Sequence, residues 1–348
     1  MARQFNYSTT LAGLMTPQVV LALGDVHEHR GRQSLYLASK PQVLETLCEV
    51  AKVQSTSSSN RIENISTSDE RLRAIMEKTT EPRNRDEREI AGYRYVLDLI
   101  HQQYANIPVT PGVILQLHRD LYRYQDVSFA GRWKDSDNSI VEILDDGTKR
   151  TRFTPVSAAR TPDAIAAICE QYKLEMERGI FDPLLISLVF AFDFVSIHPF
   201  NDGNGRLSRL LTLLLLYKCN YLVGKYVSVE AEIEASKESY YDALQASSAG
   251  WLEGSNDYTR FVTYMLGVLT ACYRTLDVRY DALTSSESNE EKLRAYFATV
   301  VGAVSKRQIM DDNPTISKRT IERVLQRLQD EEVITKVGAA RATKYKRR

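Results

Sequence analysis

Twelve residues organise this chain: His198-Pro199-Phe200-Asn201-Asp202-Gly203-Asn204-Gly205-Arg206-Leu207-Ser208-Arg209. They begin after one apolar segment, 184–197, and lead into another, 207–217. Glycine disfavours helix interiors, so Gly203 and Gly205 are expected to interrupt the helical pattern and expose main-chain amides at the start of the second helix. Such amides, together with the positive end of the helix dipole, bind anions such as phosphate. The stretch therefore predicts a phosphate-binding turn between two core helices.

The side chains of this stretch carry the reactive groups. Arg206 and Arg209 are three residues apart in a first helical turn, so both can reach the same side of the helix. Asp202 stands beside the glycines, where a carboxylate can hold a Mg²⁺ ion that bridges two phosphates. His198, at the end of the preceding helix, is the natural proton acceptor. The stretch therefore predicts a site for nucleotide chemistry.

These residues resemble, position for position, the signature HxFx(D/E)GNGRxxR of the Fic family, whose members transfer part of a nucleotide to protein hydroxyl groups. The resemblance implies a mainly α fold, a Fic-type helical bundle with a β-hairpin flap. It also implies that ATP is the substrate and that Mg²⁺ is held by Asp202. The phosphates would lie on Gly203, Asn204, Gly205, Arg206 and Arg209. The plain alternative is a glycine turn between core helices whose charges are only solvated.

A second motif lies upstream, at Ser59-Asn60-Arg61-Ile62-Glu63-Asn64. Local chemistry predicts that the polar run 55–59 ends a helix over 41–54 and that Ser59 caps a short surface helix over 60–64. The motif also resembles the inhibitory pattern (S/T)xxxE(G/N) of the Fic family, in which the glutamate pairs with the second arginine of the signature. Glu63 would then pair with Arg209, with Ser59 and Asn64 completing the inhibitory motif. An arginine held in such a charge-assisted pair cannot bind the γ-phosphate.

Residues 138–154 change the character of the chain, since two β-rich runs flank Asp145-Asp146-Gly147 and predict a hairpin. The family resemblance implies that this hairpin is a flap that aligns a target peptide by edge pairing. Tyr240 and Tyr241 match a tyrosine pair that contacts the base and ribose in relatives. The asparagine that follows the pair in relatives is Ser248 here, which leaves the base preference open. Ordinary half-buried tyrosines remain the alternative.

The remaining N-terminal features suggest structure rather than chemistry. Residues 1–40 show little periodicity, and His27-Glu28-His29 is expected to lie in a solvated loop rather than to bind a metal. His118 lies on an apolar face and is expected to be a core histidine. Amphipathic helices are expected within 69–104 and over 112–122, 161–178 and 236–244.

The C-terminal residues 290–348 resemble a winged helix-turn-helix, with helices over 292–301, 307–310 and 317–331 and a hairpin over 333–338 and 343–346. A basic face on such a domain suits DNA phosphates. DNA binding, dimerisation and target docking all stay open for this part. The basic residues are Lys318, Arg319, Arg323, Arg327, Lys336, Arg341, Lys344, Lys346, Arg347 and Arg348.

Length and composition indicate an ordinary globular protein of several parts. The chain has 348 residues, 43% of them hydrophobic, and a net charge of +0, so no global field marks a nucleic-acid or membrane protein. We expect an N-terminal helical region over 1–110, a catalytic core over 111–280, a linker over 281–289 and the winged helix over 290–348. The four cysteines lack metal or disulfide spacing and suggest a reducing compartment. With no signal core and no apolar run of about eighteen residues, a cytoplasmic protein is expected.

Taken together, the motifs predict an autoinhibited protein adenylyltransferase. It would transfer AMP from ATP to Ser, Thr or Tyr hydroxyls of a target protein and of itself, with His198 as the general base. Removal of AMP from modified proteins, transfer of another nucleotide, and DNA-binding regulation through the winged helix remain alternatives. The target protein, the trigger that lifts inhibition and the formation of a homodimer stay open.

Overall fold

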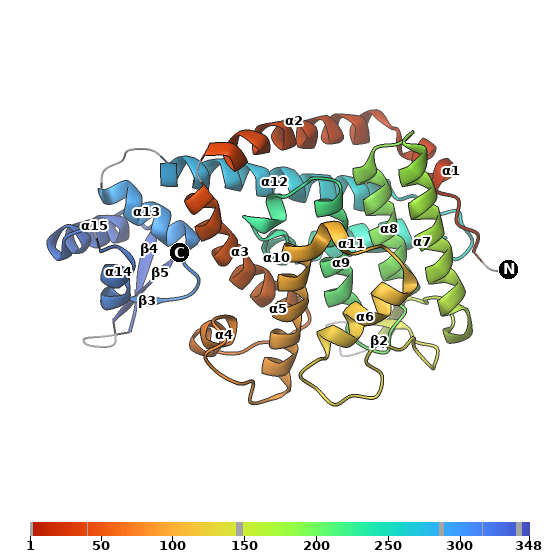
Figure 1. Ribbon diagram of the computed structural model, residues 1–348, viewed down its shortest axis with the longest axis horizontal. Helices are drawn as coiled ribbons and strands as arrows, with labels where there is room; N and C mark the ends of the chain where they lie inside the picture. Colours follow the sequence, from red (N-terminus) through yellow and green to blue (C-terminus); the bar gives the residue numbers. More distant parts are fainter. Residues whose placement is uncertain (1–2, 40, 144–148, 285–288, 315, 339–342) are drawn as a thin grey trace.

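The chain is mainly helical, with two small antiparallel sheets. The computed structural model describes residues 3–39, 41–143, 149–284, 289–314, 316–338 and 343–348 (Figure 1). The elements of the main body are α1 (Tyr7–Leu14), α2 (Pro17–Ser39), α3 (Pro41–Ile62), α4 (Asp69–Met76), α5 (Arg85–Gln103), η1 (Tyr104–Asn106), α6 (Pro111–Leu121), β1 (Ile140–Ile143), β2 (Lys149–Phe153), η2 (Ala158–Arg160), α7 (Thr161–Arg178), α8 (Pro183–Ile197), α9 (Asn204–Lys218), η3 (Val223–Lys225), α10 (Val229–Ala235), α11 (Lys237–Ser248) and α12 (Thr259–Thr284).

Helices α8 and α9 form the centre of the body, on either side of the twelve-residue turn. Helix α8 is apolar on nearly all faces and almost entirely buried, as its sequence predicts. It begins after Asp182, whose Oδ1 accepts the Leu184 N–H at 2.8 Å. It ends at His198, which adopts the left-handed conformation at φ 51°. The functional turn is therefore anchored to the most buried helix of the molecule.

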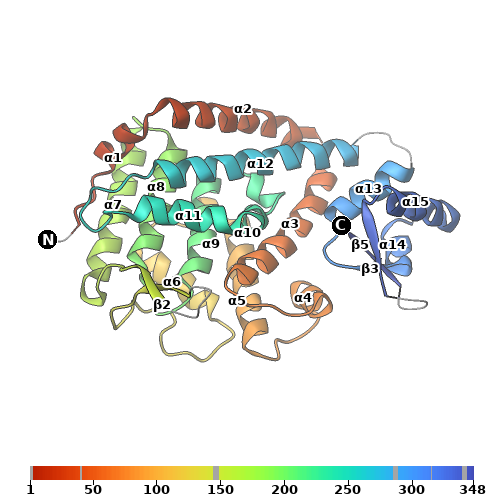
Figure 2. The same cartoon turned by 180° about the vertical axis from the view of Figure 1, so that it is seen from behind.

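The N-terminal residues are helical and belong to this body. Helix α2 lies along α12 across one side of the molecule (Figures 1 and 2). The expectation of a solvated loop around His27 was wrong, because His27 and His29 lie on α2. His27 Nε2 is 2.8 Å from Asp182 Oδ2, and His29 Nδ1 is 3.6 Å from Asp277 Oδ2.

Helix α3 corrects a second expectation, since it continues through the serine run to Ile62. Residues 55–59 are buried, and Ser55 Oγ donates to Ser228 Oγ of the segment before α10 at 2.9 Å. Small hydroxyl side chains allow the two backbones to approach closely. This tertiary packing outweighs the low helix propensity of serine. Ser59 is therefore an interior helical residue and not an N-cap.

The predicted boundary at residue 110 does not separate two cores. One apolar cluster extends from Tyr7 to Tyr280 and includes residues of the N-terminal helices and of α5 to α12. The expected linker is also shorter, because α12 continues to Thr284, and residues 285–288 lie outside the described residues. The N-terminal helices and the predicted catalytic core thus share one apolar cluster.

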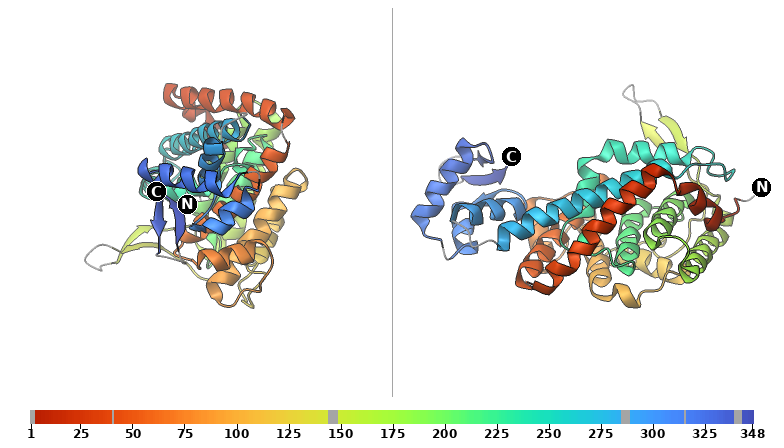
Figure 3. Two further views of the ribbon diagram at one scale, coloured as in Figure 1. Left: turned by 90° about the vertical axis from the view of Figure 1, so that its left-hand side faces the viewer. Right: turned by 90° about the horizontal axis from the view of Figure 1, so that it is seen from above.

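The hairpin of β1 and β2 is antiparallel, with Ile143 opposite Lys149, and it stands out from the body beside α11 (Figure 3). Its expected Asp-Gly turn lies outside the described residues. Two strands alone are marginally stable and need a partner surface. Phe153 provides this contact, since its ring packs edge-on against the Trp251 ring with the ring centroids 5.9 Å apart. Trp251 Nε1 in turn donates to the buried Asp193 Oδ1 at 2.7 Å. The hairpin is thereby tied to helix α8.

The C-terminal part has its own apolar core. Its elements are α13 (Asn289–Thr299), β3 (Val304–Ser305), α14 (Lys306–Asp312), α15 (Lys318–Asp330), β4 (Ile334–Val337) and β5 (Lys344–Arg347), with strand order β3-β5-β4. This arrangement is typical of a winged helix-turn-helix. The expected basic face is partly neutralised, because Arg327 pairs with Glu290 and Glu331, and Arg348 pairs with Glu332. Arg341 lies outside the described residues.

Within the part of the chain that the structure describes, no single helix is both long and apolar enough to cross a bilayer. By length and composition, α1 and the first part of α2 reach that extent only when taken together, and these two helices meet at a 90° bend.

Candidate functional site

The turn between α8 and α9 is held from inside by Phe200, which is completely buried. The His118 ring stacks on the Phe200 ring with centroids 3.7 Å apart, and Trp133 stacks against it at 5.3 Å. Asn204 closes the turn, since its Oδ1 accepts the Phe200 N–H at 2.9 Å and its Nδ2 donates to the Phe200 carbonyl at 2.8 Å. The predicted phosphate-binding turn is therefore held in place by contacts within the protein.

His118 is the core histidine that its apolar surroundings predict, and it also positions Asp202. The Gly131 N–H donates to its Nδ1 at 2.9 Å, so the ring proton is on Nε2, which lies 3.0 Å from the Asp202 carbonyl. Burial lowers the pKa of His118 to about 4, so the ring is neutral near pH 7. No sequence motif indicates that His118 holds Asp202 in position.

Lys134 fastens the same turn from the side of the hairpin. Its N–H donates to the Pro199 carbonyl at 2.9 Å, while Nζ donates to the Ile197 carbonyl at 3.3 Å and to Asn138 Oδ1 at 2.8 Å. Burial lowers the pKa of Lys134 to about 8. Lys134 therefore links the end of α8 to the segment that leads into the hairpin, a role the sequence analysis missed.

The glycines at the start of α9 leave its main-chain amides open to close approach by another group. Gly203 is the N-cap residue in the left-handed conformation at φ 81°, and Gly205 lies in the first turn of the helix. The first amides of a helix have no carbonyl partner within the helix. A Cβ on Gly205 would overlap Glu63 Oε1, so the Glu63 carboxylate lies directly against this helix start. The Glu63 carboxylate therefore lies next to the amides that are predicted to bind phosphate.

Gly205→Ala tests this contact. We expect the added methyl group to lower the free energy of unfolding by about 1–3 kcal/mol, because the site is already filled by Glu63. In a Glu63→Gly background the same change should instead raise it by up to about 1 kcal/mol, since alanine favours helix. Denaturant unfolding measures both values. Gly267→Ala, at a helical glycine with nothing within 4 Å of the new methyl group, should be stabilising in both backgrounds. Equal costs of Gly205→Ala in the two backgrounds would contradict the contact.

Glu63 and Arg209 form the ion pair that the family pattern implies. Arg209 Nη2 lies 2.8 Å from Glu63 Oε1, and the guanidinium also donates from Nε to Ser59 Oγ and from Nη2 to the Ser59 carbonyl, both at 2.8 Å. Burial opposes the charge of Arg209, but Glu63 beside it holds the pKa of the guanidinium above its ordinary value. The guanidinium of Arg209 therefore contacts Ser59 and Glu63 at the same time.

Asn64 explains the Gly-or-Asn position of the pattern. It follows the end of α3 in the left-handed conformation at φ 60°, and its N–H donates to the Arg61 carbonyl at 3.0 Å. Glycine and asparagine adopt this conformation most readily at helix ends. Lys237 Nζ donates to the Ile62 carbonyl at 2.9 Å, and Arg61 pairs with Glu234 at 2.6 Å. These contacts fix the end of α3, and with it Glu63, against α10 and α11.

Arg206 is directed into the protein. Its Nη1 lies 2.6 Å from Glu89 Oε2, its Nη2 donates to the Tyr122 hydroxyl at 2.9 Å, and its side chain is 2% exposed. Arg206 is predicted to bind phosphate, and in the structure its guanidinium already contacts Glu89 and Tyr122. The sequence analysis assigned no role to Glu89. A carboxylate between apolar positions of a helix is a pattern that could have indicated a buried, paired glutamate here.

Asp202 meets the requirements for a phosphate-bridging magnesium ion. Its carboxylate is 42% exposed beside the helix start, and Oδ1 accepts the Gly203 N–H at 2.6 Å. Among the described residues, no group of three or more His, Cys, Asp or Glu side chains forms a metal cage. Mg²⁺ is commonly bound by one carboxylate together with waters and substrate phosphates. The donor set fits an ion that arrives with a nucleotide.

One cavity of about 320 Å³ brings half of the twelve predicted site residues together. Its walls include His198, Gly205 and Arg209 on the signature side and the hairpin residues Ile140, Arg152 and Phe153 opposite. The predicted tyrosine pair joins them, as do Glu63, Ser196 and Val195. Ser248, the position that departs from the family pattern, also lies in this wall. The remaining lining residues are Leu244 and Gln245.

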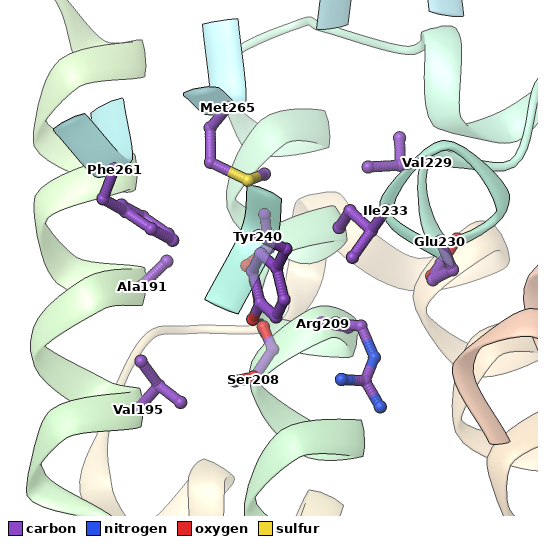
Figure 4. A pocket seen from close by; sticks show the side chains of 11 residues that line it. Ala191, Val195, Ser208, Arg209, Val229, Glu230, Ile233, Tyr240, Phe261 and Met265 are labelled. Carbon is purple, nitrogen blue, oxygen red and sulfur yellow. Dashed lines mark hydrogen bonds between the residues drawn. The ribbon is translucent and has the colours of Figure 1, made fainter. Parts of the chain in front are cut away.

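A much smaller cavity, of about 10 Å³, lies behind Tyr240 (Figure 4). Its walls come from α8, α9, α10, α11 and α12, and Figure 4 shows the Tyr240 ring above Ser208 and Arg209. The space holds at most about one water molecule. Tyr240 is therefore packed from behind and presents a fixed ring to the larger cavity.

His198 is neutral at physiological pH. Partial burial and the nearby charge of Lys134 lower its pKa to about 4, while Glu63 and Asp202 act in the opposite direction. A neutral imidazole can accept a proton. Its place at the end of α8, in the wall of the cavity, suits that task.

We expect the His198 resonance to titrate far below that of an ordinary histidine. Its Cε1–H chemical shift should stay constant from about pH 8 to about pH 5.5, where a free imidazole would change charge. The Glu63→Gly variant should titrate lower still, because the Glu63 carboxylate favours the imidazolium. Proton NMR, with the resonance assigned by comparison with His198→Ala, measures both. A midpoint near 6.5 would contradict the burial of this ring.

Comparison with known families identifies the central part of the chain. The model of the Fic/DOC family matches residues 108–216. Protein adenylyltransferase fic-1 of Caenorhabditis elegans is 28% identical over 152 residues, 44% of this chain and 25% of that protein. Protein adenylyltransferase Fic of Aedes aegypti is 33% identical over 99 residues, 28% of this chain and 17% of that protein. The matches span a quarter or less of these relatives.

Solved structures extend the likeness to nearly the whole chain. A Fic family protein from Desulfovibrio desulfuricans G20 superposes with a TM-score of 0.62 at 22% identity, covering 96% of this chain and 97% of that one. A fragment of Fic-1 from Caenorhabditis elegans superposes with a TM-score of 0.60 at 22% identity, covering 78% of this chain and 74% of that one. At these identities the likeness establishes the fold.

Proposed function

This chain carries a Fic domain, and from that premise we propose that it is an autoinhibited protein adenylyltransferase that transfers AMP from ATP to protein hydroxyl groups. One observation carries the proposal. A single cavity, bounded by the hairpin, contains His198, the amide-bearing start of α9 at Gly205, and the pair of Arg209 and Glu63. A proton acceptor, an anion site and an occupied phosphate-binding arginine therefore meet at one place.

The nucleotide would bind with its phosphates on the amides of Gly203, Asn204 and Gly205. Helix starts of this kind bind phosphate through N–H groups and the helix dipole. Tyr240 and Tyr241 in the cavity wall would contact the base and ribose. Asp202 would hold Mg²⁺, which supplies positive charge to the phosphates and to the leaving pyrophosphate.

The transfer requires a group that accepts the hydroxyl proton and a fixed alignment of that hydroxyl with the α-phosphorus. A Ser, Thr or Tyr hydroxyl oxygen attacks the α-phosphorus, and its proton passes to the neutral His198. The new oxygen–phosphorus bond forms as the bond between the α-phosphorus and the bridging oxygen breaks, and pyrophosphate leaves with that electron pair. Positioning and fixed charges supply most of the rate enhancement in such transfers. The hairpin would align the target by strand pairing, which places a hydroxyl without demanding one sequence.

Glu63 would inhibit by two effects at one position. Its carboxylate occupies Arg209, which would otherwise receive the γ-phosphate. It also lies against the start of α9, where its negative charge repels a phosphate. ATP bound beside it would be held in a pose unsuited to attack.

Mass spectrometry tests the proposed reaction and donor together. The Glu63→Gly chain, incubated with ATP and Mg²⁺, should gain the mass of one or more AMP groups, while the natural chain gains little. ATP replaced by GTP measures the base preference that Ser248 leaves open. An absence of any nucleotide adduct on the variant or on added lysate proteins would overturn the proposal.

Removal of AMP from modified proteins is the second candidate. Glu63 lines the same cavity as His198, so its carboxylate could orient a water molecule toward a phosphorus atom held there. Incubation of an adenylylated protein with the natural chain should then release AMP, and the Glu63→Gly chain should not.

A further inference from the structure

A second cavity, of about 230 Å³, lies on the Asp202 side of the site. Its walls include the turn from Asn201 to Arg206, Arg85 and Glu89 of α5, and Ile65. Glu63, His198 and Gly205 line both this cavity and the one beside the tyrosines. The two cavities are therefore neighbours across the Glu63 carboxylate. A nucleotide bound in the proposed pose, with its base beside Tyr240 and Tyr241 and its phosphates on the start of α9, would place its outer phosphates next to the second cavity.

Two arginines among the described residues line this second cavity, and their side chains differ in exposure to solvent. Arg206 is 2% exposed and is engaged with Glu89 and Tyr122. Arg85 is 72% exposed, and its Nε donates to Glu89 Oε1 at 2.6 Å. Its Nη2 lies 3.4 Å from Asp202 Oδ2. Glu89 therefore holds the Arg85 guanidinium by its Nε edge, while the opposite end reaches the carboxylate beside the phosphate-binding turn.

The backbone of Arg85 is also fixed. It is the first residue of α5, and the preceding Asn84 caps that helix by accepting the Glu87 N–H at 2.9 Å. Glu87 in turn pairs with Arg71 at 2.6 Å. An exposed arginine on a capped and braced helix end loses little freedom when it binds an anion.

We propose that Arg85 is a phosphate-binding residue of this site, contacting the β- and γ-phosphates of ATP and the pyrophosphate that the transfer releases. The inference rests on the proposed function. A guanidinium suits this task because its fork of N–H donors matches phosphate oxygens. Arg85 thereby supplies, from α5, an exposed guanidinium beside the turn, whereas the guanidinium of Arg206 is buried against Glu89 and Tyr122.

Binding of three probes to the full chain tests the assignment. Isothermal titration calorimetry on the Glu63→Gly chain would compare ATP, inorganic pyrophosphate and AMP in the presence of Mg²⁺. Arg85→Ala should weaken ATP and pyrophosphate about five- to tenfold and leave AMP unchanged, since AMP lacks the outer phosphates. Arg85→Lys should restore part of the affinity. Arg88→Ala, an exposed arginine on the same helix that does not line the cavity, is the matched control and should bind all three probes normally.

Each other outcome has a distinct meaning. Unchanged ATP and pyrophosphate affinity in Arg85→Ala would overturn the proposal and leave Arg85 as a surface partner of Glu89. Equal weakening of all three probes, or a lowered unfolding temperature, would also overturn it, because the loss would then come from a disturbed turn. A Glu63→Gly chain that binds neither ATP nor AMP would instead refute the proposed function, whatever Arg85 does.

Discussion

Replacing Glu63 by glycine should raise AMP transfer, including modification of the chain itself, by roughly 10- to 150-fold. The change frees Arg209 from a carboxylate that lies 2.8 Å away. It also removes a negative charge from the start of α9. A hydrogen bond to a charged group is worth about 1.5–3 kcal/mol, and that free energy corresponds to the stated range of rates. Transfer of label from α-labelled ATP to protein measures the effect.

Two companion variants separate the causes of this increase. Glu63→Gln keeps the size of the side chain and removes its charge, so it should recover only the electrostatic part of the gain. Glu63→Gly combined with Arg209→Ala should lose most of the gain, because the freed arginine is what receives the γ-phosphate. An unchanged rate in Glu63→Gly would refute the inhibitory role of this glutamate.

His198→Ala should abolish AMP transfer while ATP still binds. A positioned general base contributes about 10²- to 10⁴-fold to such a step, so the Glu63→Gly chain should lose at least two orders of magnitude in rate. In the proposed binding mode the phosphates contact the start of α9 and Arg209, which this substitution leaves in place. Rates from labelled ATP and affinity from calorimetry give the two values separately.

The rest of the site should survive this substitution. The turn is fastened by Phe200, Asn204 and Lys134, none of which uses the His198 side chain in its contacts. The unfolding temperature of His198→Ala should therefore stay close to that of its parent. If the variant still modified proteins at the parent's rate, the base would have to be another group of the cavity.

Local patterns in the chain were sufficient for the parts of the fold that depend on neighbours in sequence. The apolar run 184–197 and the break at Gly203 together predict two helices joined by a turn, and the structure has them. The hairpin beside the cavity and the three-helix C-terminal part follow equally from periodicity and turn residues. The pairing of Glu63 with Arg209 was accessible only through the family resemblance.

What the tertiary structure alone decided concerns residues whose partners are distant in sequence. Ser59 looks like a helix cap, yet packing against α10 makes it an interior residue of α3 that binds Arg209. Arg206 stays predicted to bind phosphate, and only the folded chain shows that it is buried against Glu89 of α5 and that Arg85 lines the same cavity.

The proposed function requires that nucleotide phosphates bind to the uncapped amides at the start of α9, beside the neutral imidazole of His198. Sequence determines that start, because glycines and apolar flanks act over a few residues. Only the folded chain determines which charges surround it, since burial and pairing depend on side chains brought in from elsewhere.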